Sequence, residues 1–164
     1  MTIHQYNVDT AFINGGLEQN VYICTPQGVD MQPNQDLKLN RSLYGLKQAA
    51  ATWFRTISIV FKDMSFVACV SDMCVFVRRD GNLSWVFVAF YVDDMLIGGV
   101  SVDSIKQVAD ELSIHFRLKT LGKVRFKFGI EVEYEMGANQ VKISQSACIT
   151  RKVEKFNQVD AKTA

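Results

Sequence analysis

The chain has 164 residues, 48% of them hydrophobic and 21% charged, which is the composition of a globular domain with a sizeable core. Its 18 Lys and Arg against 17 Asp and Glu leave a formal charge of +1, so a nucleic-acid partner would need contacts from other parts of a longer protein. The longest apolar run, Trp85–Val92, is far shorter than the ~20 residues that span a bilayer, and no secretory signal opens the chain, so we expect an intracellular protein without a membrane segment.

The first third of the chain is predicted to form short strands and turns, and it is followed by a segment with the hydrophobic period of a helix. Turn residues follow the first two strands, and the expected strands are Gln5–Ala11, Val21–Cys24 and Leu37–Leu39. Apolar residues then recur every three or four positions, which predicts a helix from about Tyr44 to Asp63.

The middle of the chain alternates strands with a helix. Strands are expected over Cys74–Arg78, Trp85–Tyr91 and Met95–Gly99, with a hairpin turn at Asp80-Gly81. The second of them is apolar nearly throughout, which is typical of a strand buried on both faces. A helix follows, with Ser101 or Asp103 as its N-cap and Ile105 to Phe116 on its buried face.

The last third is expected to form a strand over Val124–Tyr134, a turn at Gly137–Asn139, a strand over Val141–Ser144 and a helix over about Ser146–Phe156. This order of strands and helices predicts an α+β fold, an antiparallel β-sheet with helices packed on one face.

Two adjacent carboxylates, Asp93 and Asp94, stand between two apolar strands. Neighbouring carboxylates repel each other, and a cation removes that repulsion. Mg²⁺ takes oxygen ligands and is commonly held by one or two carboxylates together with substrate phosphates. Asp also favours turns, so from spacing alone a metal site and an ordinary hairpin turn stay equally open.

The residues around this pair resemble a known family. Tyr91-Val92-Asp93-Asp94 resembles the YxDD box of reverse transcriptases. Five further blocks resemble the polymerase of Ty1/copia-type retrotransposons, and in chain order they are TAFING at 10–15, VYI with PQG at 21–28, LYGLKQA with Trp53 at 43–53, LG with FGIEV at 121–132, and ISQS at 143–146. The blocks follow the family's order and cover almost the whole chain, so the resemblance is specific.

The resemblance implies a partial polymerase palm over residues 1–164, with the start of a thumb helix at about 145–157. Its activity would be RNA-directed DNA polymerisation, with Asp93 and Asp94 as catalytic residues and metal ligands for two Mg²⁺ or Mn²⁺ ions. Its partners would be an RNA or DNA template-primer and deoxynucleoside triphosphates. The fingers, most of the thumb and the RNase H region would belong to other parts of a longer polyprotein.

The resemblance also implies roles in nucleotide and primer binding. Phe12 resembles the gate residue that excludes a ribose 2′-hydroxyl, and a core Phe at a strand end is the alternative. Lys47 and Gln48 would lie at the start of a helix that positions template and nucleotide, and a solvated helical face is the alternative. Tyr91 is a further nucleotide-binding candidate, and the residues that resemble the primer grip are Phe128, Gly129, Ile130 and Glu131.

The pattern breaks at its first motif, because Asn7 stands where the family has an essential Asp. An amide oxygen can ligate Mg²⁺ but brings no charge, so we expect weak or absent metal binding and an inactive chain. Asp9 is not expected to compensate, because residues i and i+2 of a strand lie about 6.6 Å apart. Two other functions stay open, a non-catalytic palm that binds nucleic acid or a protein, and a decayed element without a selected role.

Overall fold

The computed structural model describes residues 1–29, 36–80, 84–127, 129–135 and 140–158. The chain divides into two compact units, Met1–Gly122 and Lys123–Ala164. Several residues singled out in the sequence lie outside the described residues: Gly81, Phe128 and the turn at 137–139.

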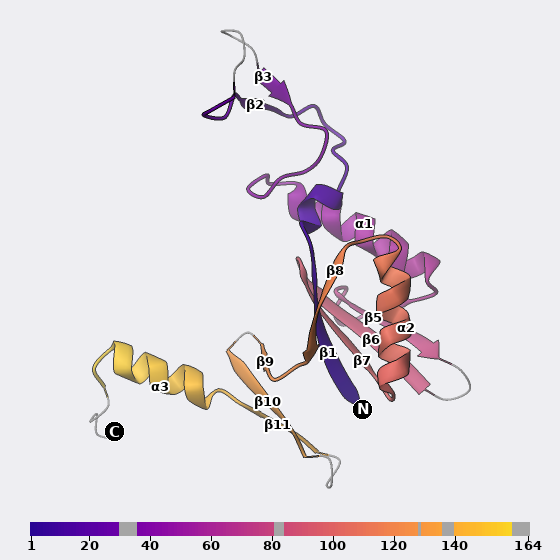
Figure 1. Cartoon of the computed structure of the whole chain (residues 1–164), viewed down its shortest axis with the longest axis vertical. Helices are drawn as coiled ribbons and strands as arrows, with labels where there is room; N and C mark the ends of the chain where they lie inside the picture. Colours follow the sequence, from indigo (N-terminus) through magenta and orange to yellow (C-terminus); the bar gives the residue numbers. More distant parts are fainter. Residues whose placement is uncertain (30–35, 81–83, 128, 136–139, 159–164) are drawn as a thin grey trace. The chain divides into compact units, whose positions relative to one another are not determined.

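The first unit is built on an antiparallel sheet (Figure 1). Within the described residues this sheet has six strands in the order β4-β5-β6-β7-β1-β8. Their bounds are Thr2–Val8 (β1), Val67–Ala68 (β4), Val75–Asp80 (β5), Ser84–Tyr91 (β6), Asp94–Gly99 (β7) and Leu118–Lys123 (β8). The N-terminal strand therefore lies inside the sheet, between β7 and β8. A separate hairpin pairs β2 (Tyr22–Cys24) with β3 (Asp36–Lys38).

Two helices, α1 (Ala49–Asp63) and α2 (Val102–Ser113), pack on one face of this sheet. Val88 of β6 lies opposite Phe76 of β5 and Ile97 of β7, and all three side chains are buried. Residues opposite each other in an antiparallel pair share a face, so this is the face that the helices cover. The large helical side chains fully buried in this core are Trp53, Ile57 and Phe61 from α1 and Ile105, Val108 and Leu112 from α2. The predicted α+β fold is confirmed.

The expectation that β6 is buried on both faces is wrong. Val86, Val88 and Phe90 are buried, whereas Trp85 is 57% exposed and Tyr91 67% exposed. The side chains alternate between the two faces of a strand, and the helices cover only one of them. Trp85 and Tyr91, two of the aromatic residues on which the prediction rests, lie on the face that the helices leave uncovered.

The helix α1 begins at Ala49, five residues later than the sequence indicates, with Gln48 as its N-cap. Gly45 has a φ of 96°, in the left-handed region that glycine adopts without strain, and the N–H of Leu46 closes a turn onto the carbonyl of Leu43. This turn interrupts the helical period, because a helix needs right-handed φ values without a break.

The strand β1 also ends earlier than predicted, at Val8 and not at Ala11. Thr10 has a φ of 52°, which breaks the extended conformation, and Ala11–Asn14 form a 3-10 helix, η1. The short strands β4 and β8 were not predicted, because neither segment alternates apolar and polar residues.

The second unit contains β9 (Phe126–Lys127), β10 (Ile130–Glu135), β11 (Gln140–Ser144) and α3 (Ser146–Lys155). Its described strands form a sheet in the order β11-β10-β9. The single strand predicted over Val124–Tyr134 is therefore two strands, and Gly129 between them has a φ of 80°. The assignment of α3 to the start of a thumb stays a prediction. In the parts of the chain that the structure describes, no helix is long and apolar enough to cross a membrane.

The side chain of Arg78 connects β5 to α2 and to the residue that follows α1. Arg78 donates from Nη1 to Glu111 Oε2 of α2 at 2.6 Å and to the carbonyl oxygen of Met64, just after α1, at 3.0 Å. Its guanidinium also lies 4.7 Å from the ring centroid of Phe66. The hydrogen bond from Arg78 is the main reason that the pKa of Glu111 lies below its ordinary value of 4.5.

We predict that Glu111→Gln lowers the free energy of unfolding at pH 7 by about 1–3 kcal/mol, the usual size for a charge-assisted hydrogen bond. A carboxyl whose pKa is lowered by folding stabilises the native state above its unfolded pKa and loses that contribution as the pH falls below about 4.5. The difference between the variant and the unmodified chain should therefore shrink in acid. Urea titrations of both chains at pH 7 and at a pH below about 4.5 check this. Glu18→Gln is the control, because Glu18 pairs with Arg55 on the surface, where a pair contributes at most about 1 kcal/mol; equal losses in the two variants would contradict the prediction.

Candidate functional site

The turn between β6 and β7 carries the adjacent carboxylates. Tyr91 pairs with Asp94, which leaves Val92 and Asp93 as the two residues of the turn. Val92 has a φ of 57°, an uncommon value for a β-branched residue, whereas tight hairpin turns require a positive φ at this position. Such a conformation persists where the surrounding structure holds it.

Two elements of the first unit, α1 and β1, hold this turn. The indole N–H of Trp53, from α1, donates to the carbonyl oxygen of Val92 at 2.7 Å. The backbone N–H of Val8, at the end of β1, donates to the carbonyl oxygen of Asp93 at 2.7 Å. Trp53 is fully buried, and its ring meets that of Phe116, just after α2, edge-on at 5.1 Å. The turn is therefore fixed by backbone and core contacts.

The sequence placed Trp53 on a helix face and in a motif, but did not predict this contact. The available signal was chemical: a buried tryptophan usually finds an acceptor for its N–H. Nothing local in the sequence says that the acceptor lies 39 residues away.

Asn7 lies beside both carboxylates. It stands opposite Asp94 in the pairing of β1 with β7. Its side-chain nitrogen Nδ2 donates to Asp93 Oδ2 at 2.8 Å. All three side chains are partly buried. The structure thus brings the first-motif position and the adjacent acids together, across 86 residues of sequence.

Asp9 has a different environment. It follows the end of β1, and its Oδ2 lies 3.1 Å from Nε of Arg117. Its backbone N–H also donates to the carbonyl oxygen of Arg117 at 2.9 Å. The charge of Asp9 is thus paired with a cation from the segment that follows α2.

Phe12 and Tyr44 form an aromatic pair near the turn. Phe12 belongs to the core cluster, and its ring centroid lies 4.3 Å from that of Tyr44. Tyr44 is 56% exposed, and contact of its ring with the protein raises its pKa, as does the negative charge of Asp93. Tyr44 therefore lies within the electrostatic reach of the carboxylate turn, although no pattern in the sequence indicates that the two are neighbours.

The other predicted nucleotide-binding residues lie at the ends of the elements that meet the turn. Lys47 is exposed in the turns before α1, and Gln48 is the half-buried N-cap, whose carbonyl accepts from the N–H of Thr52. These two residues therefore precede the helix, whereas the sequence predicted that they lie at its start. Tyr91 is largely exposed at the end of β6.

The predicted primer-grip residues lie in the second unit. Gly129 adopts a positive φ of 80° before β10, and Ile130 pairs with Lys127 of β9. The side chain of Glu131 accepts a hydrogen bond from Ser144 Oγ at 2.8 Å. Their role stays a prediction, and Phe128 lies outside the described residues.

The side chains around the turn do not fit a pair of divalent cations. Across the described ranges no group of three or more His, Cys, Asp and Glu is arranged to hold a metal ion. The oxygen donors at the turn are two carboxylates and one neutral amide, and that amide presents its NH₂ group to Asp93. Two divalent cations would meet only two negative charges here.

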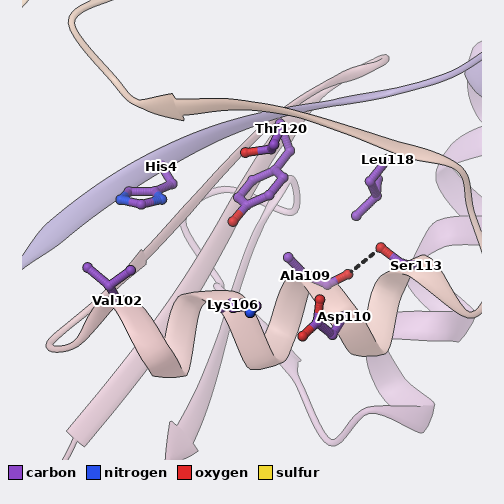
Figure 2. A pocket seen from close by; sticks show the side chains of 9 residues that line it. His4, Val102, Lys106, Ala109, Asp110, Ser113, Leu118 and Thr120 are labelled. Carbon is purple, nitrogen blue, oxygen red and sulfur yellow. Dashed lines mark hydrogen bonds between the residues drawn. The ribbon is translucent and has the colours of Figure 1, made fainter.

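A cavity of about 390 Å³ lies elsewhere, between β1, β8 and α2 (Figure 2). His4 and Thr120 line its strand side, and Lys106 and Asp110 line its helix side. His4 is separated from Asn7 by an odd number of positions along β1, so the two side chains lie on opposite faces of the sheet. The cavity is therefore not part of the carboxylate site.

The fold and the turn together define an α+β domain that presents two adjacent carboxylates on a hairpin next to its first strand. The family model described as "Reverse transcriptase (RNA-dependent DNA polymerase)" matches residues 1–164, and the chain belongs to this family. The expected relationship to the Ty1/copia-type polymerases is confirmed by its relatives.

Three of these relatives are Pol polyproteins of transposons. The chain is 34% identical over 164 residues to the retrovirus-related Pol polyprotein from transposon TNT 1-94 of Nicotiana tabacum, which covers 99% of the chain and 12% of the polyprotein. It is 37% identical over 133 residues to that from transposon RE1 of Arabidopsis thaliana, covering 80% of the chain and 9% of the polyprotein. It is 27% identical over 163 residues to the transposon Ty1-MR1 Gag-Pol polyprotein of Saccharomyces cerevisiae, covering 94% of the chain and 9% of the polyprotein. The chain thus spans about a tenth of the length of these relatives.

We predict that Trp53→Phe destabilises the first unit by about 1–3 kcal/mol through the carbonyl of Val92 that it leaves without its donor, in addition to the packing lost with the smaller ring. Trp85→Phe is the matched control. Trp85 is 57% exposed, and a substitution there should change stability by no more than about 0.5 kcal/mol. Urea unfolding followed by far-ultraviolet circular dichroism measures both, and equal losses would contradict the role given to Trp53.

Proposed function

We propose that this chain is the palm of a copia-type reverse transcriptase and that the Asp93-Asp94 hairpin is its polymerase centre. The observation that carries the proposal is the placement of Asn7, opposite Asp94 and hydrogen-bonded to Asp93. This placement unites the first motif of the family with its YxDD box. The relationship to Pol polyproteins supports the assignment.

We further propose that the chain does not polymerise DNA. Reverse transcriptases generally use divalent metal ions, and transfer of a nucleotide requires compensation of the negative charge on the triphosphate. Asn7 leaves this site one negative charge short of three carboxylates. The side chains at the turn therefore lack the charge to hold two such ions.

The substrates of the parent activity would be an RNA or DNA template-primer and a deoxynucleoside triphosphate. Lys47 and Tyr91 support this part of the proposal, because both are exposed. Lys47 comes just before α1, whose Trp53 donates to the turn, and Tyr91 is the last residue of β6 before the turn. In this arrangement Phe12 and Gln48 would also take part in nucleotide binding. The primer grip would be formed by Phe128, Gly129, Ile130 and Glu131. The formal charge of +1 indicates that other regions of a Pol polyprotein supply much of the backbone contact.

We predict that the purified chain extends a DNA primer on an RNA template no faster than its Asp93→Ala variant, in Mg²⁺ or in Mn²⁺. The missing charge at position 7 is the reason, since removal of one stabilising group from a polar active site commonly costs about 100–1,000-fold in rate. Single-nucleotide extension with labelled primer measures the rate. Extension that is lost on Asp93→Ala would contradict the proposed inactivity.

Binding of template-primer is a separate expectation, because it does not require the catalytic charge. We predict salt-sensitive binding of a labelled RNA–DNA duplex, measured by fluorescence anisotropy, and a weaker affinity after Lys47→Ala. Lys62→Ala is the control, because Lys62 is also exposed and lies at the other end of α1. A chain that binds no duplex, or that responds equally to both changes, would contradict the placement of nucleic acid at the start of α1.

A further inference from the structure

We infer that the hydrogen bond from Asn7 to Asp93 stabilises the β6–β7 turn without a cation, whereas an aspartate at position 7 would make the turn depend on one. The inference rests on the proposed function only in taking the turn as a former metal site. Its physical basis is the contact from Asn7 Nδ2 to Asp93 Oδ2, 2.8 Å long and partly buried. This contact gives Asp93 a donor from within the protein.

The same position occupied by an aspartate would have the opposite effect. A carboxylate oxygen would replace the NH₂ group next to Asp93 Oδ2, and two negatively charged oxygens at hydrogen-bond distance repel each other strongly where water is partly excluded. Such a pair requires a cation or a proton between its members. Asn7 supplies hydrogen atoms for the same place without any added charge.

The neighbouring contacts complete this arrangement. Asn7 donates to the side chain of Asp93, and the next residue, Val8, donates to its backbone carbonyl. Trp53 donates to the carbonyl of Val92. The two residues of the turn thus receive three hydrogen bonds from α1 and β1, and none of these bonds requires an ion.

The orientation of the Asn7 amide also opposes metal binding. The amide presents nitrogen to Asp93, so its oxygen could ligate a cation shared with Asp93 only after the side chain rotates. Rotation breaks the bond to Asp93 and places two oxygens next to each other. Metal binding by this chain would therefore compete with a contact of the native state.

The test is a set of thermal melts of the full chain in EDTA and in millimolar Mn²⁺. We expect the unmodified chain to melt at the same temperature in both. Asn7→Asp should melt about 4–10 °C lower in EDTA, given about 2–4 °C for each kcal/mol in a chain of this size, and should regain several degrees in Mn²⁺ because an ion that binds only the native state stabilises it.

Two further variants separate the hydrogen bond from a general effect of the substitution. The double variant Asn7→Asp with Asp93→Asn exchanges the amide and the carboxylate, so it should melt within about 2 °C of the unmodified chain in EDTA and show no response to Mn²⁺. Asn14→Asp applies the same chemical change to another partly buried asparagine, whose Nδ2 donates to the carbonyls of Asp9 and Thr10. This variant should gain nothing from Mn²⁺.

Three results would overturn the inference: an Asn7→Asp variant as stable in EDTA as the unmodified chain, an unmodified chain that Mn²⁺ stabilises equally, or a double variant as unstable as Asn7→Asp. If Asn7→Asp is unfolded in EDTA, circular dichroism after addition of Mn²⁺ decides, since recovery of the helical signal supports the inference and no recovery contradicts it. None of these melts involves nucleic acid or polymerisation, so they can fail while duplex binding succeeds, or succeed while it fails.

Discussion

The hydrogen bonding of the β6–β7 turn is the constraint on which the arrangement of the first unit depends. The positive φ of Val92 is an unfavourable backbone conformation for valine, and it persists only because neighbouring residues hold the turn. Trp53 does so from α1, and Val8 does so from β1. Because Trp53 is also buried against Phe116, the same side chain connects the turn to the segment after α2. Trp53 thus belongs to the hydrophobic core and also contacts the site, and a change in the packing of α1 would reach the turn at Val92 through one hydrogen bond.

Strand alternation separates the core from the carboxylate site within β1. Tyr6 and Val8 are buried on the face that the helices cover, whereas Asn7 lies between them on the opposite face, in line with Asp94. A register slip of one residue would exchange these faces, so burial of Tyr6 and Val8 fixes the position of Asn7. The apolar pattern of the strand thus places a polar residue at the site, although that residue contributes little to the core itself.

The sequence predicted those parts of the molecule that depend on neighbours along the chain. The helix α2 with its Ser101 cap, the strands β5 to β7 and the pair of acids follow from period, turn residues and spacing. The start of α1 was missed because Gly45 adopts a positive φ inside an apparently helical period. The contacts of Trp53 with Val92 and of Asn7 with Asp93 join residues 39 and 86 positions apart, and no local pattern encodes such pairings. Alternation also could not say that only one face of β6 is covered, since this depends on where the helices pack.

On the proposal that this turn derives from a polymerase centre, the change to asparagine acts in opposite directions on chemistry and on folding. Clustered carboxylates lower the stability of a native state without a cation, and proteins retain such groups where catalysis needs their charge. Replacement of one carboxylate by an amide removes the repulsion and adds a hydrogen-bond donor. The native state is stabilised, while the reaction loses a negative charge that it needs. The substitution is also nearly isosteric, which leaves the packing of Tyr6 and Val8 undisturbed. A palm that has lost this aspartate can therefore remain well folded, and its sequence can keep motif residues such as Phe12, Ala49 and Trp53 because they also form part of the core.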